Sequence, residues 1–369
     1  QDCLRAGDTV ARFGGDEFVA VVPLESSAEA TIVAERILER LQPRFRIDER
    51  QLASLPSIGI SLFPQDGLTA DALIQAADTA MYSAKRAGKN QYRYFAESMN
   101  DQVAERLRLE AQLRDALEQE QLLLHFQPRV GLAHGRTCGC EALLRWQHPE
   151  RGLLLPGAFL PVAEQSALIA EIDRYVLARA MRQVASWQRA GHELVVSINL
   201  SAHLLESDGI APEIARMIEA EQVRPEGIEL EITEGIVMQD FQRVSRQLRD
   251  LEARAPGLRI ALDDFGSGYS SLQYLRELPI DTLKIDRSFV ADLDTHDPQD
   301  TGRAIAKTIV ELGQNLALHV IAEGVETAEQ AEVLESIGCR EAQGFWFAHP
   351  MAATDFAESL ARPPTPPEA

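Results

Sequence analysis

The chain is poor in cysteine, in aromatic residues, in positive charge and in long apolar runs. Aromatic residues make up 6% of its 369 residues. Its four cysteines have neither the spacing of zinc ligands nor the density of a disulfide framework, so we expect a reducing, cytoplasmic setting. No apolar run is long enough to cross a bilayer. The thiols are Cys3, Cys138, Cys140 and Cys339.

Negative charge dominates the composition. The 57 Asp and Glu outnumber the 36 Lys and Arg, which gives a formal net charge of −21. Because binding to a nucleic acid duplex depends on neutralising phosphates with basic side chains, this composition argues against that class of partner. The chain begins with Gln1, so we expect a fragment of a longer protein that carries an upstream sensory domain or membrane anchor.

The first 96 residues alternate strand-like and helix-like runs. A hairpin is predicted at 11–24 around Gly14-Gly15. Residues 29–42 carry apolar side chains at helical spacing, and a second helix begins at 71 and closes at Gly88. Residues 97–118 contain no Gly or Pro and are rich in helix formers, which predicts a helical linker.

The region 119–362 predicts a (β/α)₈ barrel, an α/β fold. Eight strand-like runs follow residue 121, and amphipathic helices are predicted between most of them. The proline-rich segment 363–369 is expected to be a disordered tail. The strand-like runs are 122–130, 138–146, 195–201, 228–234, 259–265, 282–286, 319–325 and 342–348.

Polar groups stand at or near the ends of these apolar runs. A carboxylate in apolar surroundings is costly, and neighbouring carboxylates repel one another, unless a cation is shared between them. Strand ends of such a barrel meet at one active site. The pattern therefore predicts a metal site. The groups are Glu141, Asn199, Glu231, Asp263, Asp264, Lys284, Asp286, Glu323 and Glu326.

Their order resembles the EAL family of cyclic di-GMP phosphodiesterases. The resemblance implies a barrel with an antiparallel first strand and two divalent ions, Mg²⁺ or Mn²⁺. It also implies hydrolysis of one phosphodiester bond to linear pGpG and an EAL homodimer. The matching motifs are Glu141-Ala142-Leu143, Asn199, Glu231-Ile232-Thr233-Glu234, Asp263-Asp264-Phe265-Gly266, Lys284-Ile285-Asp286 and Glu323-Gly324-Val325-Glu326.

The resemblance assigns a role to each of these residues. It implies that Asp263 bridges both ions and that Asp264 serves the second. Oxygen ligands suit hard cations, and paired ions can activate water while neutralising charge on a phosphate. An ion-pair network without turnover is the structural alternative. The other implied ligands are Glu141, Asn199, Glu231 and Glu323.

Lys284 matches a lysine that orients or deprotonates the attacking water. Surrounded by acids, it should stay protonated, which favours orientation and charge stabilisation. A salt bridge to Asp286 is the simpler alternative. Matches to substrate-contacting positions are Gln127, Arg145, Asp286 and Gln343. Arg145 would offer a bidentate fork to a phosphate.

Three further residues have supporting roles in the resemblance. Glu234 would hold the loop 265–271, whose glycines allow it to move and in which Ser267 keeps a hydroxyl group. Glu326 is expected to brace the ligand shell.

Residues 1–96 resemble the C-terminal part of a GGDEF (diguanylate cyclase) domain. The family's opening strand, with its metal-binding aspartate, would lie upstream of Gln1, so this piece is not expected to make cyclic di-GMP. Arg5 and Asp8 match an inhibitory RxxD site, and Lys85 and Lys89 match phosphate contacts. The signature is Gly14-Gly15-Asp16-Glu17-Phe18.

The sequence thus predicts a metal-dependent cyclic di-GMP phosphodiesterase with a regulatory or inactive GGDEF remnant. Three alternatives stay open at this point. One is a catalytically silent receptor for cyclic di-GMP, and another is a bifunctional cyclase and phosphodiesterase in the longer protein. The third is a different metallohydrolase on the same barrel, because a fold does not fix a substrate.

Overall fold

The computed structural model of the protein contains two compact units, Gln1–Leu109 and Glu110–Ala369. Ser267 and the predicted tail 363–369 lie outside the residues that the structure describes. Those described residues are 3–5, 7–24, 27–42, 45–47, 50–52, 55–207, 209–266, 272–293 and 301–360.

The first unit is built from short sheets and two helices. Strands β1 (Thr9–Gly14) and β2 (Glu17–Val21) form the predicted antiparallel hairpin, which turns at Gly15 with a φ of 51°. Helix α2 (Ala70–Arg86) packs on β5 (Ser57–Ile60) so closely that a Cβ at Gly59 would lie 1.8 Å from the carbonyl oxygen of Ala77. The other elements are α1 (Ser27–Leu41), β3 (Phe45–Ile47), β4 (Arg50–Leu52) and β6 (Gln91–Tyr94).

Helix α3 (Glu97–Glu118) covers the range in which the sequence predicts a helical linker. It passes through the boundary between the two units at Leu109 and Glu110. Leu113 and Ala116 are fully buried, whereas Leu107 is 62% exposed. The apolar positions of this helix are therefore only partly used in packing.

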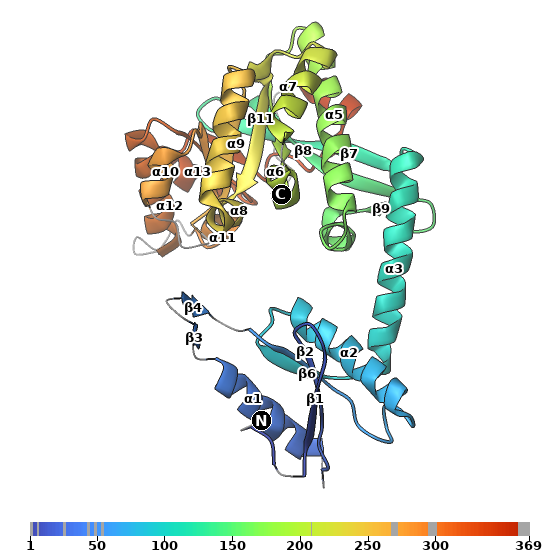
Figure 1. Ribbon diagram of the computed structural model, residues 1–369. Helices are drawn as coiled ribbons and strands as arrows, with labels where there is room; N and C mark the ends of the chain where they lie inside the picture. Colours follow the sequence, from blue (N-terminus) through green and yellow to red (C-terminus); the bar gives the residue numbers. More distant parts are fainter. Residues whose placement is uncertain are drawn as a thin grey trace. The chain divides into compact units, whose positions relative to one another are not determined.

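The second unit is a closed barrel. Eight strands of its described part pair in the circular order β7-β8-β10-β11-β12-β13-β14-β15, and β7 returns to β15. Figure 1 shows β7, β8 and β11 within this barrel. Strand β7 is antiparallel to both neighbours, as the resemblance implied, and the others run parallel. The strands are β7 (Leu122–Gly131), β8 (Arg136–His148), β10 (Val195–Asn199), β11 (Ile228–Thr233), β12 (Arg259–Phe265), β13 (Thr282–Ile285), β14 (His319–Ala322) and β15 (Glu341–Gln343).

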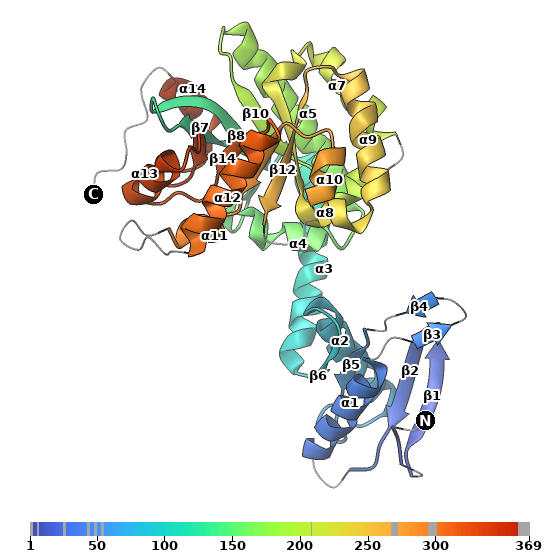
Figure 2. The ribbon, with the colours of Figure 1, turned by 90° about the vertical axis from the view of Figure 1, so that its left-hand side faces the viewer.

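Helices cover the outside of the barrel. Helix α5 (Leu168–Arg189) packs against α7 (Ile210–Glu221), and α7 packs against α9 (Phe241–Arg254), as Figures 1 and 2 show. Each buries an apolar face that repeats at helical spacing. The remaining elements are β9 (Gly152–Leu154), η1 (Pro156–Ala158), α4 (Leu160–Ala163), α6 (Ala202–Glu206), η2 (Pro225–Gly227), α8 (Glu234–Gln239), α10 (Leu272–Glu277), α11 (Arg287–Ala291), α12 (Thr301–Asn315), α13 (Ala328–Ser336), β16 (Met351–Ala352) and α14 (Ala353–Ser359).

The eighth predicted strand was wrong in its length. It was expected over 342–348, but β15 ends at Gln343. The chain turns there because Gly344 lies against the backbone of Val325, where a Cβ would meet the carbonyl oxygen at 2.0 Å. The amide of Trp346 then donates to the same carbonyl. The turn fixes Gln343 at the carboxyl end of the strand.

The structure also describes the cysteines and the apolar character of the helices. All four cysteines are free thiols, and Cys140 and Cys339 are buried. Among the described residues, no helix is both long and apolar enough to cross a membrane.

Candidate functional site

Lys284 lies at the centre of a group of carboxylates where the parallel strands end. Its side chain is completely buried. The Nζ atom lies 2.8 Å from Oε2 of Glu231 and 3.5 Å from Oδ1 of Asp263. It also contacts Oε1 of Glu323 and is 4.0 Å from Oε2 of Glu141. We call these five residues the carboxyl-end cluster.

Strand register explains why these residues meet. Glu231 of β11 pairs with Asn199 of β10, and Asp263 of β12 pairs with Thr233 at the end of β11. Parallel strands in register present their last residues at one rim of the barrel. Groups more than 180 residues apart in the sequence therefore reach the same ammonium group.

The cluster carries more negative than positive charge. Burial alone would lower the pKa of Lys284, but the surrounding carboxylates raise it well above its usual value. Burial, with the other carboxylates, raises the pKa of Glu231 well above its usual range despite Lys284. Burial also raises the pKa of Glu323 to about 8. One lysine thus does not offset four carboxylates.

Glu141 is held in place by two amides. The Nδ2 of Asn199 donates to its Oε1 at 2.8 Å, and the Nε2 of Gln343 donates to its Oε2 at 2.6 Å. Gln343 also donates to Gln127 at 3.1 Å. Although burial favours the neutral acid, Lys284 and these two hydrogen bonds leave the pKa of Glu141 below its usual value. Predicted ligand and substrate positions are thereby brought together.

Asp264 follows Asp263 in a strained turn of the backbone. Its φ is 55°, and its amide donates to Oδ1 of Asp263 at 2.9 Å. Burial and the neighbouring Asp263 raise the pKa of Asp264 to about 6, and its side chain hydrogen-bonds with Asp286. A non-glycine residue with a positive φ is uncommon and often marks a functional position.

The alternative salt bridge between Lys284 and Asp286 is not formed among the described residues. Asp286 instead accepts hydrogen bonds from the amide of Ser288, at 2.9 Å, and from its hydroxyl group, and so begins α11. Lys284 lies within β13 (Thr282–Ile285), whereas Asp286 follows the end of that strand, so the two side chains belong to different segments.

Glu234 contacts the loop that it was expected to hold. It is buried, and its Oε2 accepts the amide of Gly266 at 3.1 Å. Gly266 has a φ of 98°, and a Cβ there would lie 2.9 Å from the ring of Phe289. Glycine is therefore required where the loop leaves β12. The rest of the predicted loop, with Ser267, lies outside the described residues.

Two predicted residues differ in their relation to the cluster. Arg145 is buried and its Nη1 donates to the carbonyl of Leu144 at 2.8 Å, while burial lowers its pKa. Glu326 is exposed, and within the described part of the chain its carboxylate forms no hydrogen bond or ion pair with the cluster. Its backbone amide instead donates to Gln330 at 2.7 Å, at the start of α13.

A second buried ionic group, at the amino ends of the parallel strands, was missed by the sequence analysis. Glu229 forms an ion pair with Arg129 and accepts hydrogen bonds from Ser197, at 2.7 Å, and Thr282, at 2.6 Å. Burial opposes ionisation, but Arg129 and these bonds lower the pKa of Glu229 to about 2. We call these four residues the amino-end cluster. Strand alternation was the available signal, because it places Glu229 and Glu231 on one face.

Asp173 was also missed. This buried residue of α5 accepts hydrogen bonds from the amide of Ser201, at 3.3 Å, and from its hydroxyl group. Burial raises the pKa of Asp173 to about 6. Ser201 stands two residues after Asn199 and begins α6, so Asp173 steadies the segment that follows Asn199.

The predicted motifs of the first unit lie on exposed segments. The Gly14-Gly15 turn joins β1 to β2, and Phe18 is 65% exposed. The amide of Arg5 donates to the carboxylate of Asp8 at 2.7 Å. Lys85 and Lys89, near the end of α2, are exposed.

In the described part of the chain, no three His, Cys, Asp or Glu side chains converge as closely as the ligands of one metal ion. The Lys284 ammonium group lies between the carboxylates instead. A cation site built from these residues therefore requires the carboxylates to move toward a shared ion, and it belongs with the proposals below.

Comparison with known families agrees with this geometry. Residues 110–350 match the EAL domain, and residues 1–91 match the diguanylate cyclase GGDEF domain. The first match contains the whole carboxyl-end cluster, and the second contains the Gly14-Gly15 hairpin.

Similar proteins carry both regions. The chain is 43% identical to the bifunctional diguanylate cyclase/cyclic di-GMP phosphodiesterase MucR of Pseudomonas aeruginosa, over 97% of this chain and 52% of that protein. It is 39% identical to the cyclic di-GMP phosphodiesterase PdeR of Escherichia coli, over 96% of this chain and 53% of that protein. The chain thus spans about half the length of these curated relatives.

A solved structure shares the barrel. The MucR phosphodiesterase in complex with cyclic di-GMP is 43% identical, with a TM-score of 0.64 over 68% of this chain and 99% of that one. With the family match to residues 110–350, the closed barrel and its antiparallel first strand, this likeness shows that the chain belongs to the EAL domain family.

Proposed function

We propose that the barrel hydrolyses cyclic di-GMP to linear pGpG with the help of divalent cations. The observation that carries the proposal is the carboxyl-end cluster, in which four carboxylates surround one buried lysine. The relative MucR, whose structure is a complex with cyclic di-GMP, supports the choice of substrate.

The donor set fits hard divalent cations. The Oε1 atoms of Glu231 and Gln343 are buried and accept no hydrogen bond from the described residues, whereas Oε2 of Glu231 lies 2.8 Å from the ammonium group of Lys284. Buried acceptors without donors are rare in folded proteins and call for a partner. Carboxylate and amide oxygens are the ligands that Mg²⁺ and Mn²⁺ prefer. The residues that would hold two such ions are Glu141, Asn199, Glu231, Asp263, Asp264 and Glu323.

Bound divalent cations would supply Lewis-acid activation of a water molecule and would neutralise charge on the phosphate. Glu323 has a pKa of about 8 in the cation-free cluster, so it carries a proton at neutral pH that a cation would displace. Cation affinity should therefore increase with pH up to about 8.

Other residues of the site would have separate roles in binding and catalysis. Lys284 has a raised pKa, so it stays protonated and orients water or stabilises negative charge rather than accepting a proton. Asn199 and Gln343 fix the orientation of Glu141 through their amide donors. Arg145 would contact a phosphate of the substrate through its guanidinium group.

The test is an assay of the purified chain with cyclic di-GMP and Mg²⁺ or Mn²⁺, in which the nucleotides are separated by chromatography. We expect pGpG to form with the metal and not with EDTA, and Glu141→Ala to remove turnover. Cyclic AMP and pGpG are assayed as alternative substrates, and faster hydrolysis of either one than of cyclic di-GMP would favour a different metallohydrolase. Cyclic di-GMP that binds but stays intact would favour the silent receptor instead.

A second activity of the longer protein is favoured by one observation. The relative MucR is named as bifunctional, and the GGDEF signature is present on the β1–β2 hairpin. We infer that the first unit is regulatory or inactive in this chain, and that cyclase activity would belong to the longer protein. The homodimer, the upstream sensory domain and the cytoplasmic location stay predictions.

A further inference from the structure

A pocket lies at the end of the barrel opposite to the carboxyl-end cluster. It has a volume of about 450 Å³ and is lined by residues that begin strands β12, β13 and β14, together with Arg340 before β15 and residues of α12. Arg259 starts β12, whereas Asp263 stands near its other end. The pocket is therefore separated from the proposed catalytic site by the length of the strands.

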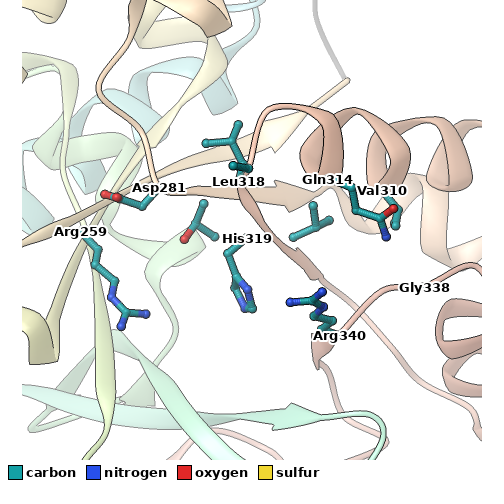
Figure 3. A pocket seen from close by; sticks show the side chains of 11 residues that line it. Arg259, Asp281, Val310, Gln314, Leu318, His319, Gly338 and Arg340 are labelled. Atoms are coloured by element: carbon teal, nitrogen blue, oxygen red, sulfur yellow. The ribbon is translucent and has the colours of Figure 1, made fainter.

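Two arginines face this pocket with no partner of their own. Arg259 and Arg340 are exposed, and neither guanidinium group forms a hydrogen bond or ion pair with the described residues. Figure 3 shows the ring of His319 between the two guanidinium groups. His319 itself is occupied, because its Nε2 lies 3.1 Å from a carboxylate oxygen of Glu341.

Strand pairing brings the two arginines to one rim. Thr282 of β13 pairs with Ala261 of β12 and with His319 of β14, and β14 in turn pairs with β15. Arg259 and Arg340 thus stand about three strand spacings, or roughly 14 Å, apart. An anionic group bound between them, next to His319, would accept hydrogen bonds from both guanidinium groups.

The local charge contrasts with that of the whole chain. The molecule has a net charge of −21, yet the pocket offers two unpaired guanidinium groups against the carboxylate of Asp281. One oxygen of Asp281 already accepts the amide of Ile260 at 2.9 Å. Within the described residues its other oxygen and the side-chain amide of Gln314 have no hydrogen-bond partner, so they can meet hydroxyl or amino groups of a ligand.

We propose that this pocket binds a small phosphorylated molecule through Arg259 and Arg340. Guanidinium groups match phosphate oxygens with two parallel hydrogen bonds, and they keep their charge at every physiological pH. The pocket volume lies in the range of small-molecule sites, and it accommodates a mononucleotide as well as free phosphate.

The experiment is calorimetric titration of the whole chain with inorganic phosphate and, separately, with guanosine monophosphate. Both titrations contain EDTA, because the cation-free carboxyl-end cluster repels phosphate and cannot supply the signal. The test variant is Arg259→Gln/Arg340→Gln. These side chains are exposed, so folding should be unaffected.

A matched control removes the same charge elsewhere. Arg216 and Arg254 line another surface hollow together with Glu213 and Glu219, so Arg216→Gln/Arg254→Gln changes the net charge equally. The single variants Arg259→Gln and Arg340→Gln serve if the double variant loses its fold.

We expect the chain and the control to bind at least one of the two probes, and Arg259→Gln/Arg340→Gln to weaken that binding at least tenfold. Stronger binding of guanosine monophosphate identifies a nucleotide as the ligand, and equal or stronger binding of phosphate identifies the free anion. The proposal is overturned if neither probe binds up to about 10 mM, or if the arginine variants bind like the unchanged chain.

Discussion

In its described residues the barrel contains two buried ionic clusters, of which one has matched charges and the other has an excess of carboxylates. In the amino-end cluster, the single carboxylate of Glu229 has a guanidinium partner and two hydroxyl donors. In the carboxyl-end cluster, one ammonium group serves four carboxylates, and Oε1 of Glu231 accepts no hydrogen bond from the described residues. Burial is common to both, so burial alone does not distinguish structure from function.

The two clusters differ in whether side chains of the protein neutralise all of the buried negative charge. A buried carboxylate that has all its donors fixes the fold, because removing a partner leaves an unpaired charge. A buried carboxylate without donors is costly until a cation is bound, and its pKa shows that cost. The pKa of Glu229 is lowered and that of Glu231 is raised, although the two stand two residues apart on one strand.

The largest effect should come from Glu231→Gln. This change removes a proposed cation ligand, so we expect turnover of cyclic di-GMP to fall below detection. The metal-free variant should keep its melting temperature, because Lys284 keeps three other carboxylate partners and the repulsion between Glu231 and those carboxylates is removed. Chromatography of the products and thermal unfolding in EDTA measure the two quantities. Measurable turnover by Glu231→Gln would contradict the ligand assignment.

Lys284→Ala should lower the rate by about 10²–10³ while cyclic di-GMP still binds, because the lysine acts on developing charge. Single-turnover kinetics and a binding titration separate the rate from the affinity. Lys307→Ala is a suitable control, since Lys307 is exposed and pairs only with Glu311 among the described residues. A loss of binding with an unchanged rate would refute a catalytic role for Lys284.

Glu229→Gln should act in the opposite way from Glu231→Gln. It leaves Arg129 buried without its carboxylate, which should lower the free energy of unfolding by about 3 kcal/mol. The rate per folded molecule should be unchanged, because Glu229 lies at the amino ends of the strands. Urea unfolding and an assay below the melting temperature test both statements. A Glu229→Gln variant as stable as the unchanged chain would show that the ion pair between Arg129 and Glu229 does not stabilise the barrel.

The free energy of unfolding should decrease at acid pH because of Glu229 in the amino-end cluster. The pKa of Glu229 is about 2 in the folded chain, below its ordinary value of 4.5. The unfolded chain therefore binds more protons in this range, so the contribution of Glu229 is complete above pH 4.5 and is lost as the pH falls toward 2. The contribution is about 3 kcal/mol. Unfolding free energies of Glu229→Gln should show a weaker dependence on pH in that window.

Glu234→Ala should have the smallest effect, a decrease in rate of about tenfold. It removes the acceptor of the Gly266 amide and so loosens the start of the loop after β12. Glu234→Gln keeps an acceptor oxygen and should retain more activity. Equal rates for both variants and the unchanged chain would show that the hydrogen bond does not support catalysis.

The sequence predicted the parts of the site that depend on local pattern. Asp263 and Lys284 could be placed near strand ends, because β-branched and apolar runs mark strands and the register of parallel strands aligns their ends. Helix α3 was also predictable, since 97–118 lacks both Gly and Pro.

Long-range partners could not be predicted in the same way. The contact of Lys284 with Glu231 rather than Asp286 depends on the end of β13 at Ile285, beyond which Asp286 accepts hydrogen bonds from Ser288 at the start of α11. The end of β15 depends on the close approach of Gly344 to Val325. Glu229 was overlooked although alternation placed it beside Glu231, because only its partner Arg129, 100 residues earlier, shows that it is structural.

The central claim is that the carboxyl-end cluster needs a cation that the chain does not supply. The most direct measurement is calorimetric titration of the metal-free chain with Mn²⁺, alongside Glu231→Gln and Glu229→Gln. We predict that the unchanged chain and Glu229→Gln bind Mn²⁺ alike and that Glu231→Gln loses this binding. Equal binding by all three proteins, or none by the unchanged chain, would contradict the account.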